Sequence, residues 1–258
     1  MFIDSHCHLD RLKLDAYGDD LAKAISAANQ AGVEKMLCIA IDRQNVPTVI
    51  DIAQRFDNIF ASVGIHPLDV DDLPATVEEL LAMAALDPKV VALGETGLDY
   101  YYSEDNKNAQ HISFIAHLEA AKQCKKPVIV HTRDAQDDTL ALLRAHSDPS
   151  VAGVMHCFTE TWDMAKQALD LGFYISISGI VTFKNAEQVR DVARRVPSDR
   201  LLIETDSPYL APVPFRGKPN EPKYVAEVAK FMADLRGVSL QQLADQTSRN
   251  FNQLFGVQ

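Results

Sequence analysis

The sequence predicts an α/β protein in which a single (β/α)8 (TIM) barrel spans residues 1–258 and carries an extra C-terminal helix. Short β-branched apolar runs alternate with amphipathic stretches, and the apolar runs number eight, the strand count of a closed barrel. Such alternation favours parallel strands joined by right-handed crossovers. An open doubly wound sheet is the main alternative, but a dinucleotide-binding sheet would have a glycine-rich turn after its first strand, and this chain has none there.

The apolar runs and the helical periodicity assign each element in order. The expected strands are residues 1–4, 35–40, 59–64, 90–94, 127–130, 152–155, 173–176 and 201–203. The expected helices are residues 20–31, 45–55, 76–86, 107–124, 135–146, 161–171, 185–195, 221–236 and 240–254. Gly32 and Gly172 follow two of these helices, and Ser239 is placed to cap the last one. The proline-rich segment 211–222 is too short for a linker and is interpreted as a rigid loop over a site.

Composition excludes several classes of protein. The chain has 258 residues, 47% of them hydrophobic and 24% charged, which rules out disordered, collagenous and coiled-coil proteins. With 25 Lys and Arg against 36 Asp and Glu, the formal net charge is −11. This charge opposes sequence-blind adhesion to nucleic acid or to an anionic membrane. A phosphate-containing substrate would therefore need a local source of positive charge.

The chain shows no signal for secretion or membrane insertion. It has no apolar stretch of about 18 residues and no basic segment leading into an apolar one, so we expect a cytoplasmic protein without membrane association. The cysteines lack a CxxC spacing, which argues against a zinc ribbon or a disulfide framework. We expect reduced thiols at Cys7, Cys38, Cys124 and Cys157.

Polar residues gather where the expected strands end, and the carboxyl ends of the strands form the active-site face of a parallel barrel. His6 and His8 point to the same face of an extended chain, although an HxH pair alone would more often reflect capping or core packing. Imidazole and carboxylate are the usual donors to Zn²⁺ or Mn²⁺, so the whole set predicts a site for one or two ions. The strand-end residues are His6, His8, His66, Glu95, His131, His156, Glu204 and Asp206.

The remaining aromatic and imidazole residues have simpler interpretations. Tyr100, Tyr101 and Tyr102 follow the fourth strand and would either line the cleft or pack within their own loop. The residues assigned to solvent or to packing are His111, His117, His146, Trp162, Phe231, Phe251 and Phe255.

Four cations are candidates for contacts with substrate phosphates. Taken alone, each is more typical of a solvated surface residue. Their positions after barrel strands favour substrate contact, because the loops there surround the substrate. Arg133 is the strongest candidate because a guanidinium can contact two oxygens of one phosphate. The four are Arg133, Lys184, Arg216 and Lys218.

Six motifs, taken together, resemble the TatD family of metal-dependent hydrolases among the amidohydrolase-like barrels. The resemblance runs from residue 3 to about 255 and includes segments 216–218 and 220–222. The motifs, in order, are DSHCHLD (4–10), GIHP (64–67), GETGLDY (94–100), VHTR (130–133), HCF (156–158) and ETDSPY (204–209).

The resemblance implies a (β/α)8 barrel with metal-dependent hydrolase activity, best known in this family as deoxyribonuclease activity, often 3′ to 5′ exonucleolytic. It implies one ion held by His6, His8, Glu95 and Asp206. Glu95 would bridge to a second ion, held also by the two remaining ligands, and Glu204 would contribute to a third ion in some relatives. The second ion's remaining ligands are His131 and His156, and His66 lies beside the site. Many amidohydrolases carry a carbamylated lysine where this chain has Glu95.

The leading functional hypothesis is hydrolysis of DNA phosphodiesters by a metal-bound hydroxide. Glu95, as the bridging carboxylate, and Asp206, as the general base, would be catalytic. His66 and the four cations would bind substrate. Zn²⁺ or Mn²⁺ is favoured, Mg²⁺ is compatible with the donors, and no obligate protein partner is inferred.

Two alternatives differ in substrate or in class. The same centre would serve an ester, lactone or amide hydrolase, for example one that cleaves an aminoacyl ester from tRNA. A metal-binding partner protein without turnover is the third hypothesis, and it would not require an open coordination position.

Overall fold

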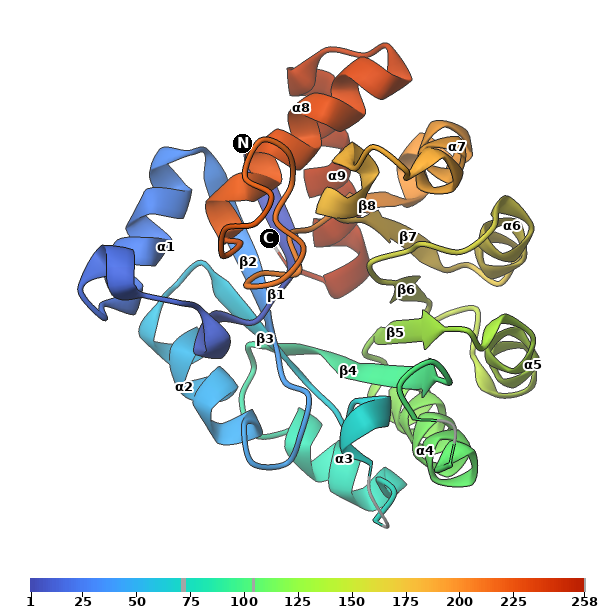
Figure 1. Ribbon diagram of the computed structural model, residues 1–258. Coiled ribbons are helices and arrows are strands. Elements are labelled where there is room, and N and C mark those ends of the chain that lie inside the picture. Colours follow the sequence, from blue (N-terminus) through green and yellow to red (C-terminus); the bar gives the residue numbers. More distant parts are fainter. Residues whose placement is uncertain (71–72, 104, 258) are drawn as a thin grey trace.

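Parallel strands follow one another around a barrel in sequence order in the computed structural model, which describes residues 1–70, 73–103 and 105–257 (Figure 1). The strands are β1 (Phe2–Cys7), β2 (Val33–Ile39), β3 (Ile59–Val63), β4 (Val90–Asp99), β5 (Val128–Arg133), β6 (Gly153–Met155), β7 (Tyr174–Ile177) and β8 (Leu201–Ile203). Every neighbouring pair from β1–β2 to β7–β8 is parallel. The predicted barrel is therefore confirmed.

Helices lie outside the strands and cover them (Figure 1). They are α1 (Leu21–Gln30), α2 (Val46–Arg55), α3 (Val77–Ala84), α4 (Lys107–Cys124), α5 (Gln136–His146), α6 (Trp162–Asp170), α7 (Glu187–Arg195), α8 (Val225–Arg236) and the extra C-terminal helix α9 (Leu240–Phe255). Expected and observed helix bounds agree within two residues except at the start of α8, where Pro222–Tyr224 form a 3-10 turn. Ser239 caps α9 through a capping box with Gln242, as its position predicted.

The last and first strands close the barrel near its carboxyl end. The amide of Asp206 donates to the carbonyl of His6 at 2.9 Å, and the amide of His8 donates to the carbonyl of Ser207 at 2.8 Å. A parallel bridge joins Cys7 to Ser207 between them. The closure therefore runs directly through the His6–His8 segment.

Three strands extend at least three residues further at their carboxyl ends than the sequence predicted. The expected strands 1–4, 90–94 and 127–130 ended too early because polar residues were interpreted as loop, whereas the structure continues β1 to Cys7, β4 to Asp99 and β5 to Arg133. The ladder between β4 and β5 runs through the pairs Gly97–His131 and Asp99–Arg133. Regular strand hydrogen bonds consequently fix the backbone that carries the polar residues at this end.

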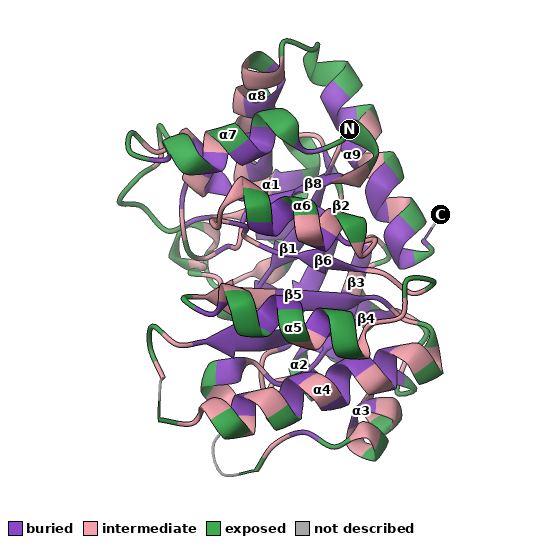
Figure 2. Cartoon of the chain, turned by 90° about the vertical axis from the view of Figure 1, so that its right-hand side faces the viewer, coloured by how far each residue is buried: buried purple, intermediate pink, exposed green. Residues whose placement is uncertain are grey.

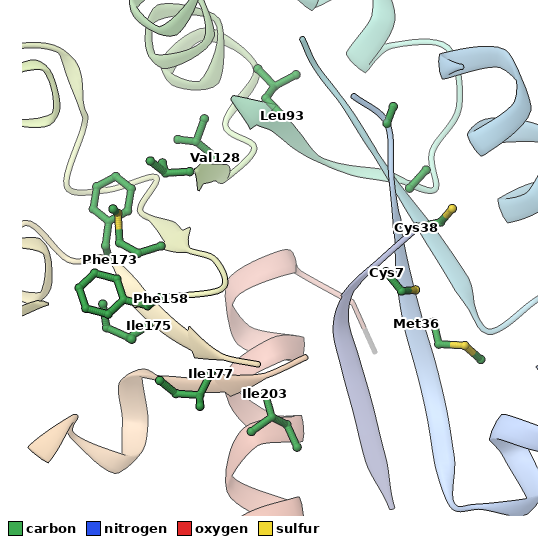
Figure 3. Close-up of a cluster of buried hydrophobic side chains, with 14 of the residues drawn as sticks. Cys7, Met36, Cys38, Leu93, Val128, Phe158, Phe173, Ile175, Ile177 and Ile203 are labelled. Atoms are coloured by element: carbon green, nitrogen blue, oxygen red, sulfur yellow. The ribbon is translucent and has the colours of Figure 1, made fainter. Parts of the chain in front are cut away.

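The core has two layers. Between strands and helices lies a continuous apolar layer, visible as buried strands beneath helices whose outer faces are exposed (Figure 2). Figure 3 shows part of this layer, where Phe158 and Phe173 lie close to Ile175 and Ile177 near β7. This burial supplies the main free energy that stabilises the barrel.

A second apolar cluster fills the barrel interior toward its amino end. Strand residues such as Leu37 and Ile129 meet Phe251 and Phe255 of α9, and all four are buried. The rings of Phe251 and Phe255 lie 4.7 Å apart. Helix α9 therefore covers the amino end, and the assignment of these two residues to packing is confirmed.

The thiol prediction is confirmed, because all four cysteines are free. No helix in the described part of the chain is both long enough and apolar enough to cross a membrane.

Candidate metal centre

The carboxyl ends of the strands bring seven of the predicted site residues into one cluster. Each comes from the end of a strand or the residues just after it, so the closed barrel itself sets their positions. They are His6, His8, His66, Glu95, His131, His156 and Asp206.

Glu95 lies at the middle of this cluster, and its two oxygens face different histidines. Oε2 lies 3.3 Å from Nε2 of His6 and 3.9 Å from Nε2 of His8. Oε1 lies 3.2 Å from Nδ1 of His131 and 2.8 Å from Nε2 of His156. One carboxylate is thus shared by two groups of donors, one at each oxygen.

Asp206 joins the group on the Oε2 side. Its Oδ1 lies 3.6 Å from Nε2 of His6 and 3.5 Å from Nε2 of His8. Its side chain is 14% exposed, compared with 4% for Glu95, so it faces the open mouth of the barrel. These are the residues that the family resemblance assigned to one ion.

Hydrogen-bond acceptors outside the cluster orient three of the histidines. Nδ1 of His8 lies 3.3 Å from the Ile39 carbonyl, and Nε2 of His131 lies 3.0 Å from Oδ2 of Asp99. An acceptor at the outer nitrogen of a neutral imidazole fixes the proton there, and the inner nitrogen keeps its lone pair.

His156 is oriented in the same way by Glu204. Nδ1 of His156 lies 3.2 Å from Oε1 of Glu204, which is fully buried. The inner nitrogens of His8, His131 and His156 therefore all suit a metal ion.

His66 has the opposite arrangement. Its Nδ1 accepts a hydrogen bond from the amide of Leu68 at 3.1 Å. The proton of the neutral ring then lies on Nε2, which faces Oε1 of Glu95 at 3.3 Å. His66 thus presents an N–H donor to the cluster, whereas His8, His131 and His156 present lone pairs.

Several buried donor atoms have no hydrogen-bond partner, which provides a test of whether the cluster suits metal ions. Both ring nitrogens of His6 and Nε2 of His156 are unpartnered, despite the short distance from His156 to Glu95. Unpaired buried polar atoms are costly in a protein interior. Imidazole and carboxylate at these separations are the donor chemistry of Zn²⁺ or Mn²⁺, so the residues fit divalent ions.

The charges of the cluster also indicate a place for cations. Burial opposes ionisation of Glu95, but His156 and His66 outweigh it and hold the pKa of this carboxyl well below its usual range. Burial likewise opposes a charge on His156, yet Glu95 and Glu204 raise its pKa well above the usual range. In the absence of a metal ion, positive charge on imidazole thus balances the carboxylates. A metal ion would displace these protons.

Two buried acidic residues hold parts of the cluster in place, and the sequence analysis assigned neither of them a role of its own. Asp4 accepts hydrogen bonds from the amide of Thr205 at 2.9 Å and from its hydroxyl at 2.5 Å, which joins β1 to the segment after β8. Burial raises the pKa of Asp4 to about 8, although the Thr205 hydrogen bonds act to lower it.

Asp99 is the second of these carboxylates. Its position four residues after Glu95 was the available signal, because alternate residues of a strand share a face. Gly97 lies between them, where an added Cβ would come within 2.0 Å of the His131 carbonyl oxygen. Only glycine permits this close approach of β4 to β5.

Arg133 contacts aromatic rings in place of an acidic partner. Its guanidinium lies 4.0 Å from the ring centroid of Tyr101 and 4.6 Å from that of Tyr102. It forms no salt bridge within residues 1–70, 73–103 and 105–257. Tyr100 is separate from this group, because its hydroxyl lies 2.6 Å from Nε2 of His111 and 2.6 Å from Asp138.

The other three cations lie on the loops after β7 and β8 and do not touch the histidine cluster. The guanidinium of Arg216 lies 3.6 Å from the ring centroid of Phe183, while Lys184 and Lys218 are exposed. None of the three forms a salt bridge with another described residue. These cations are therefore available to a ligand.

The histidines assigned to solvent or packing lie outside the cluster. His117 is buried in α4, where Nδ1 lies 2.7 Å from the Ser113 carbonyl and Nε2 accepts from the Ile65 amide at 3.1 Å. His146 is half-buried beside Glu119. His117 therefore braces the backbone directly before His66.

The chain was compared with known families, curated proteins and solved structures. A family model described as "TatD related DNase" matches residues 3–256. The metal-dependent hydrolase YcfH of Escherichia coli (strain K12) is 51% identical over 255 residues, covering 99% of this chain and 96% of that protein. This chain belongs to the TatD family. It is therefore a metal-dependent hydrolase, and the histidine–carboxylate cluster contains the groups able to bind metal.

Two further TatD relatives support the assignment. The 3′-5′ ssDNA/RNA exonuclease TatD of Enterobacter lignolyticus (strain SCF1) is 34% identical over 246 residues, covering 93% of this chain and 95% of that protein. The crystal structure of YjjV, a TatD homolog from Escherichia coli K12, is 31% identical with a TM-score of 0.91 and covers 100% of this chain and 98% of its own.

Proposed function

We propose that this TatD-family hydrolase is a deoxyribonuclease that removes nucleotides from the 3′ ends of single-stranded DNA. The observation that carries the proposal is the sharing of Glu95 between two groups of imidazole donors, an arrangement suited to two divalent ions. Two-metal sites are common in enzymes that cleave phosphodiesters. The name of the Enterobacter relative, an exonuclease acting on single strands, supports the same choice.

The residues divide into two ligand groups under this proposal. His6, His8 and Asp206 would hold one ion together with Oε2 of Glu95. Oε1 of Glu95 would hold the second, and the donor set favours Zn²⁺ or Mn²⁺ over Mg²⁺. The remaining ligands of the second ion would be His131 and His156. When bound, the ions would lower the pKa of a water molecule and offset charge on the phosphoryl oxygens.

Asp206 is the proposed general base. Burial opposes ionisation of its carboxyl, but His8 and His6 outweigh that effect and hold its pKa below the usual range. The group is therefore ionised at neutral pH, and it faces the mouth of the barrel. It is placed to accept the proton of the attacking water and to return it to the leaving oxygen.

His66 and Glu204 have supporting roles in this proposal. The Nε2–H of His66 would donate a hydrogen bond to a substrate oxygen beside Glu95. Glu204 would orient His156 through Oε1, while Oε2 has no hydrogen-bond partner and remains the atom available to a third ion.

Positive charge at the mouth favours a phosphodiester over a neutral ester or amide. The chain carries a net charge of −11, yet four cations at this end, one at the end of β5 and three on loops, have no acidic partner in a salt bridge within the described ranges. Cations left unpaired in an acidic protein indicate an anionic substrate. We assign phosphate binding to Arg133, Lys184, Arg216 and Lys218.

The test is digestion of single-stranded DNA labelled at one end or the other. We expect the metal-loaded protein to shorten the strand from its 3′ end and Glu95→Ala to lose this activity entirely. Glu34→Gln, an exposed carboxylate change on β2, is the matched control and should cleave normally. Filled metal sites without nucleotide release would refute the nuclease function. Turnover of aminoacyl or other carboxylic esters by the same protein would then identify it as an ester hydrolase.

A further inference from the structure

Beside the proposed metal centre lies a group of aromatic rings that the catalytic proposal does not use. Tyr101 and Tyr102 lie two and three residues after the end of β4 and are 58% and 64% exposed. Their rings meet edge to face, with centroids 4.7 Å apart and planes at 87°. The guanidinium of Arg133 lies against both rings, at 4.0 and 4.6 Å from the centroids. We call these three residues the aromatic platform.

The side chains of the platform contact one another through their rings and the guanidinium. Neither tyrosine hydroxyl makes a hydrogen bond within the described ranges, whereas the neighbouring Tyr100 hydroxyl bonds to Asp138. Arg133 covers part of each ring, and more than half of each side chain remains open to solvent. Two large rings held in place yet left exposed are typical of a binding surface.

Asp99 fixes the platform to the metal centre. Its Oδ1 accepts hydrogen bonds from the backbone amides of Tyr101 and Tyr102 at 3.0 and 2.9 Å. Its Oδ2 lies 3.0 Å from Nε2 of His131. The amide of Tyr100 also donates to the carbonyl of Arg133 at 3.0 Å. A single buried carboxylate thus positions both a proposed metal ligand and the backbone that carries the two rings.

We propose that the aromatic platform stacks a nucleobase of the single-stranded substrate next to the phosphodiester at the metal centre. This inference rests on the proposed nuclease function and adds how the strand is held. An open ring face binds a flat aromatic group, and bases are available for stacking when they are unpaired. Arg133, which has no salt bridge to a described residue, supplies the matching charge for the adjacent phosphate.

The ring contacts also predict the kind of selectivity. Stacking tolerates every base because each has a π face, so the platform should favour single strands over duplex without reading sequence. A duplex keeps its terminal bases stacked and paired, and it would have to fray before a base reached Tyr101 or Tyr102.

The experiment measures binding in the absence of metal, so that cleavage cannot contribute. Fluorescence anisotropy with EDTA-treated protein measures the affinity for two oligothymidylates of ten nucleotides, both labelled at the 5′ end. One strand is intact, and the other lacks the bases of its last three 3′ nucleotides. We expect the intact strand to bind roughly tenfold more tightly. The Tyr101→Ala/Tyr102→Ala protein should lose this preference, and Tyr101→Phe/Tyr102→Phe should retain it because the ring faces remain. Equal binding of the two strands by the unchanged protein, or an undiminished preference in the alanine variant, would overturn the proposal.

A second readout separates this inference from the nuclease function. If metal-loaded protein shortens the intact strand but metal-free protein binds the two strands equally, base stacking on the platform is refuted and the nuclease function stands. If binding depends on the bases and on the rings but no strand is shortened with filled metal sites, base stacking stands and the nuclease function fails.

Discussion

The two ends of the barrel bury opposite kinds of side chain. At the amino end, α9 lays Phe251 and Phe255 against apolar strand residues, and both rings are at least 95% buried. At the carboxyl end, His6, Glu95 and Glu204 are buried to the same extent, although each is polar or charged. The same strands supply both ends, so the difference lies in the residues and not in the fold.

This contrast separates stability from function. Apolar burial at the amino end stabilises the protein, whereas unpaired polar atoms at the carboxyl end reduce its stability until a ligand compensates. Changes at the amino end should therefore lower the free energy of unfolding and leave the chemistry intact. Changes to the donor residues at the carboxyl end, or to the residues that orient them, should instead reduce metal binding and activity with little loss of unfolding free energy.

The largest expected stability effect is at the amino end. Phe251→Ala removes a fully buried ring and should lower the free energy of unfolding by about 3–5 kcal/mol, with the turnover of the folded protein unchanged. Denaturant titration and assays below the unfolding midpoint provide the two measurements. Leu240→Ala, at a 37% exposed position of the same helix, is the control and should cost much less. Loss of turnover in folded Phe251→Ala would contradict the separation of stability at the amino end from function at the carboxyl end.

His117 gives the carboxyl end a dependence on pH. Burial lowers its pKa to about 4 from the ordinary 6.5, so the unfolded chain binds more protons between these values. The free energy of unfolding should therefore decline as pH falls from 6.5 to 4, by about 3 kcal/mol from this residue. His117→Gln cannot titrate and should show a shallower decline in denaturant titrations at several pH values. Identical slopes for the two proteins would contradict the assignment.

A smaller effect is expected at Asp99. In Asp99→Asn, the amide nitrogen facing Nε2 of His131 would favour the tautomer with its proton on Nδ1, the nitrogen that faces Glu95. Metal affinity and activity should fall by about 10–100-fold with little change in unfolding free energy. Asp105→Asn, an exposed change on the same loop, serves as the control. Unchanged metal affinity in Asp99→Asn would show that this carboxylate does not orient a ligand.

Periodicity was sufficient to predict the barrel, because each strand and helix buries a continuous apolar face. The expected segments 107–124 and 201–203 coincide with α4 and β8. It failed at the strand ends, where Asp99 was taken for loop although it pairs with Arg133 in a ladder. Polar residues in a strand carry no apolar alternation, so their hydrogen bonding emerges only in the fold.

The clustered donors could be predicted from strand order, whereas their orientation could not. The spacing of His6 and His8 places both side chains on one face, but which nitrogen faces inward depends on distant acceptors such as the Ile39 carbonyl for His8. The contact of Arg133 with two tyrosines likewise depends on side-chain packing between β4 and β5. The sequence motifs indicate where the chemistry lies, and the tertiary contacts determine the role of each atom.

We propose that the shared carboxylate of Glu95 joins two groups of donors into a centre for two ions. The most direct measurement is the metal content of purified protein after loading with Zn²⁺ and removal of the excess, determined by mass spectrometry. The account predicts about two ions per chain, with loss of at least one in Glu95→Gln while Glu34→Gln keeps both. One ion or fewer in the unchanged protein, or two ions retained without the Glu95 carboxylate, would contradict it.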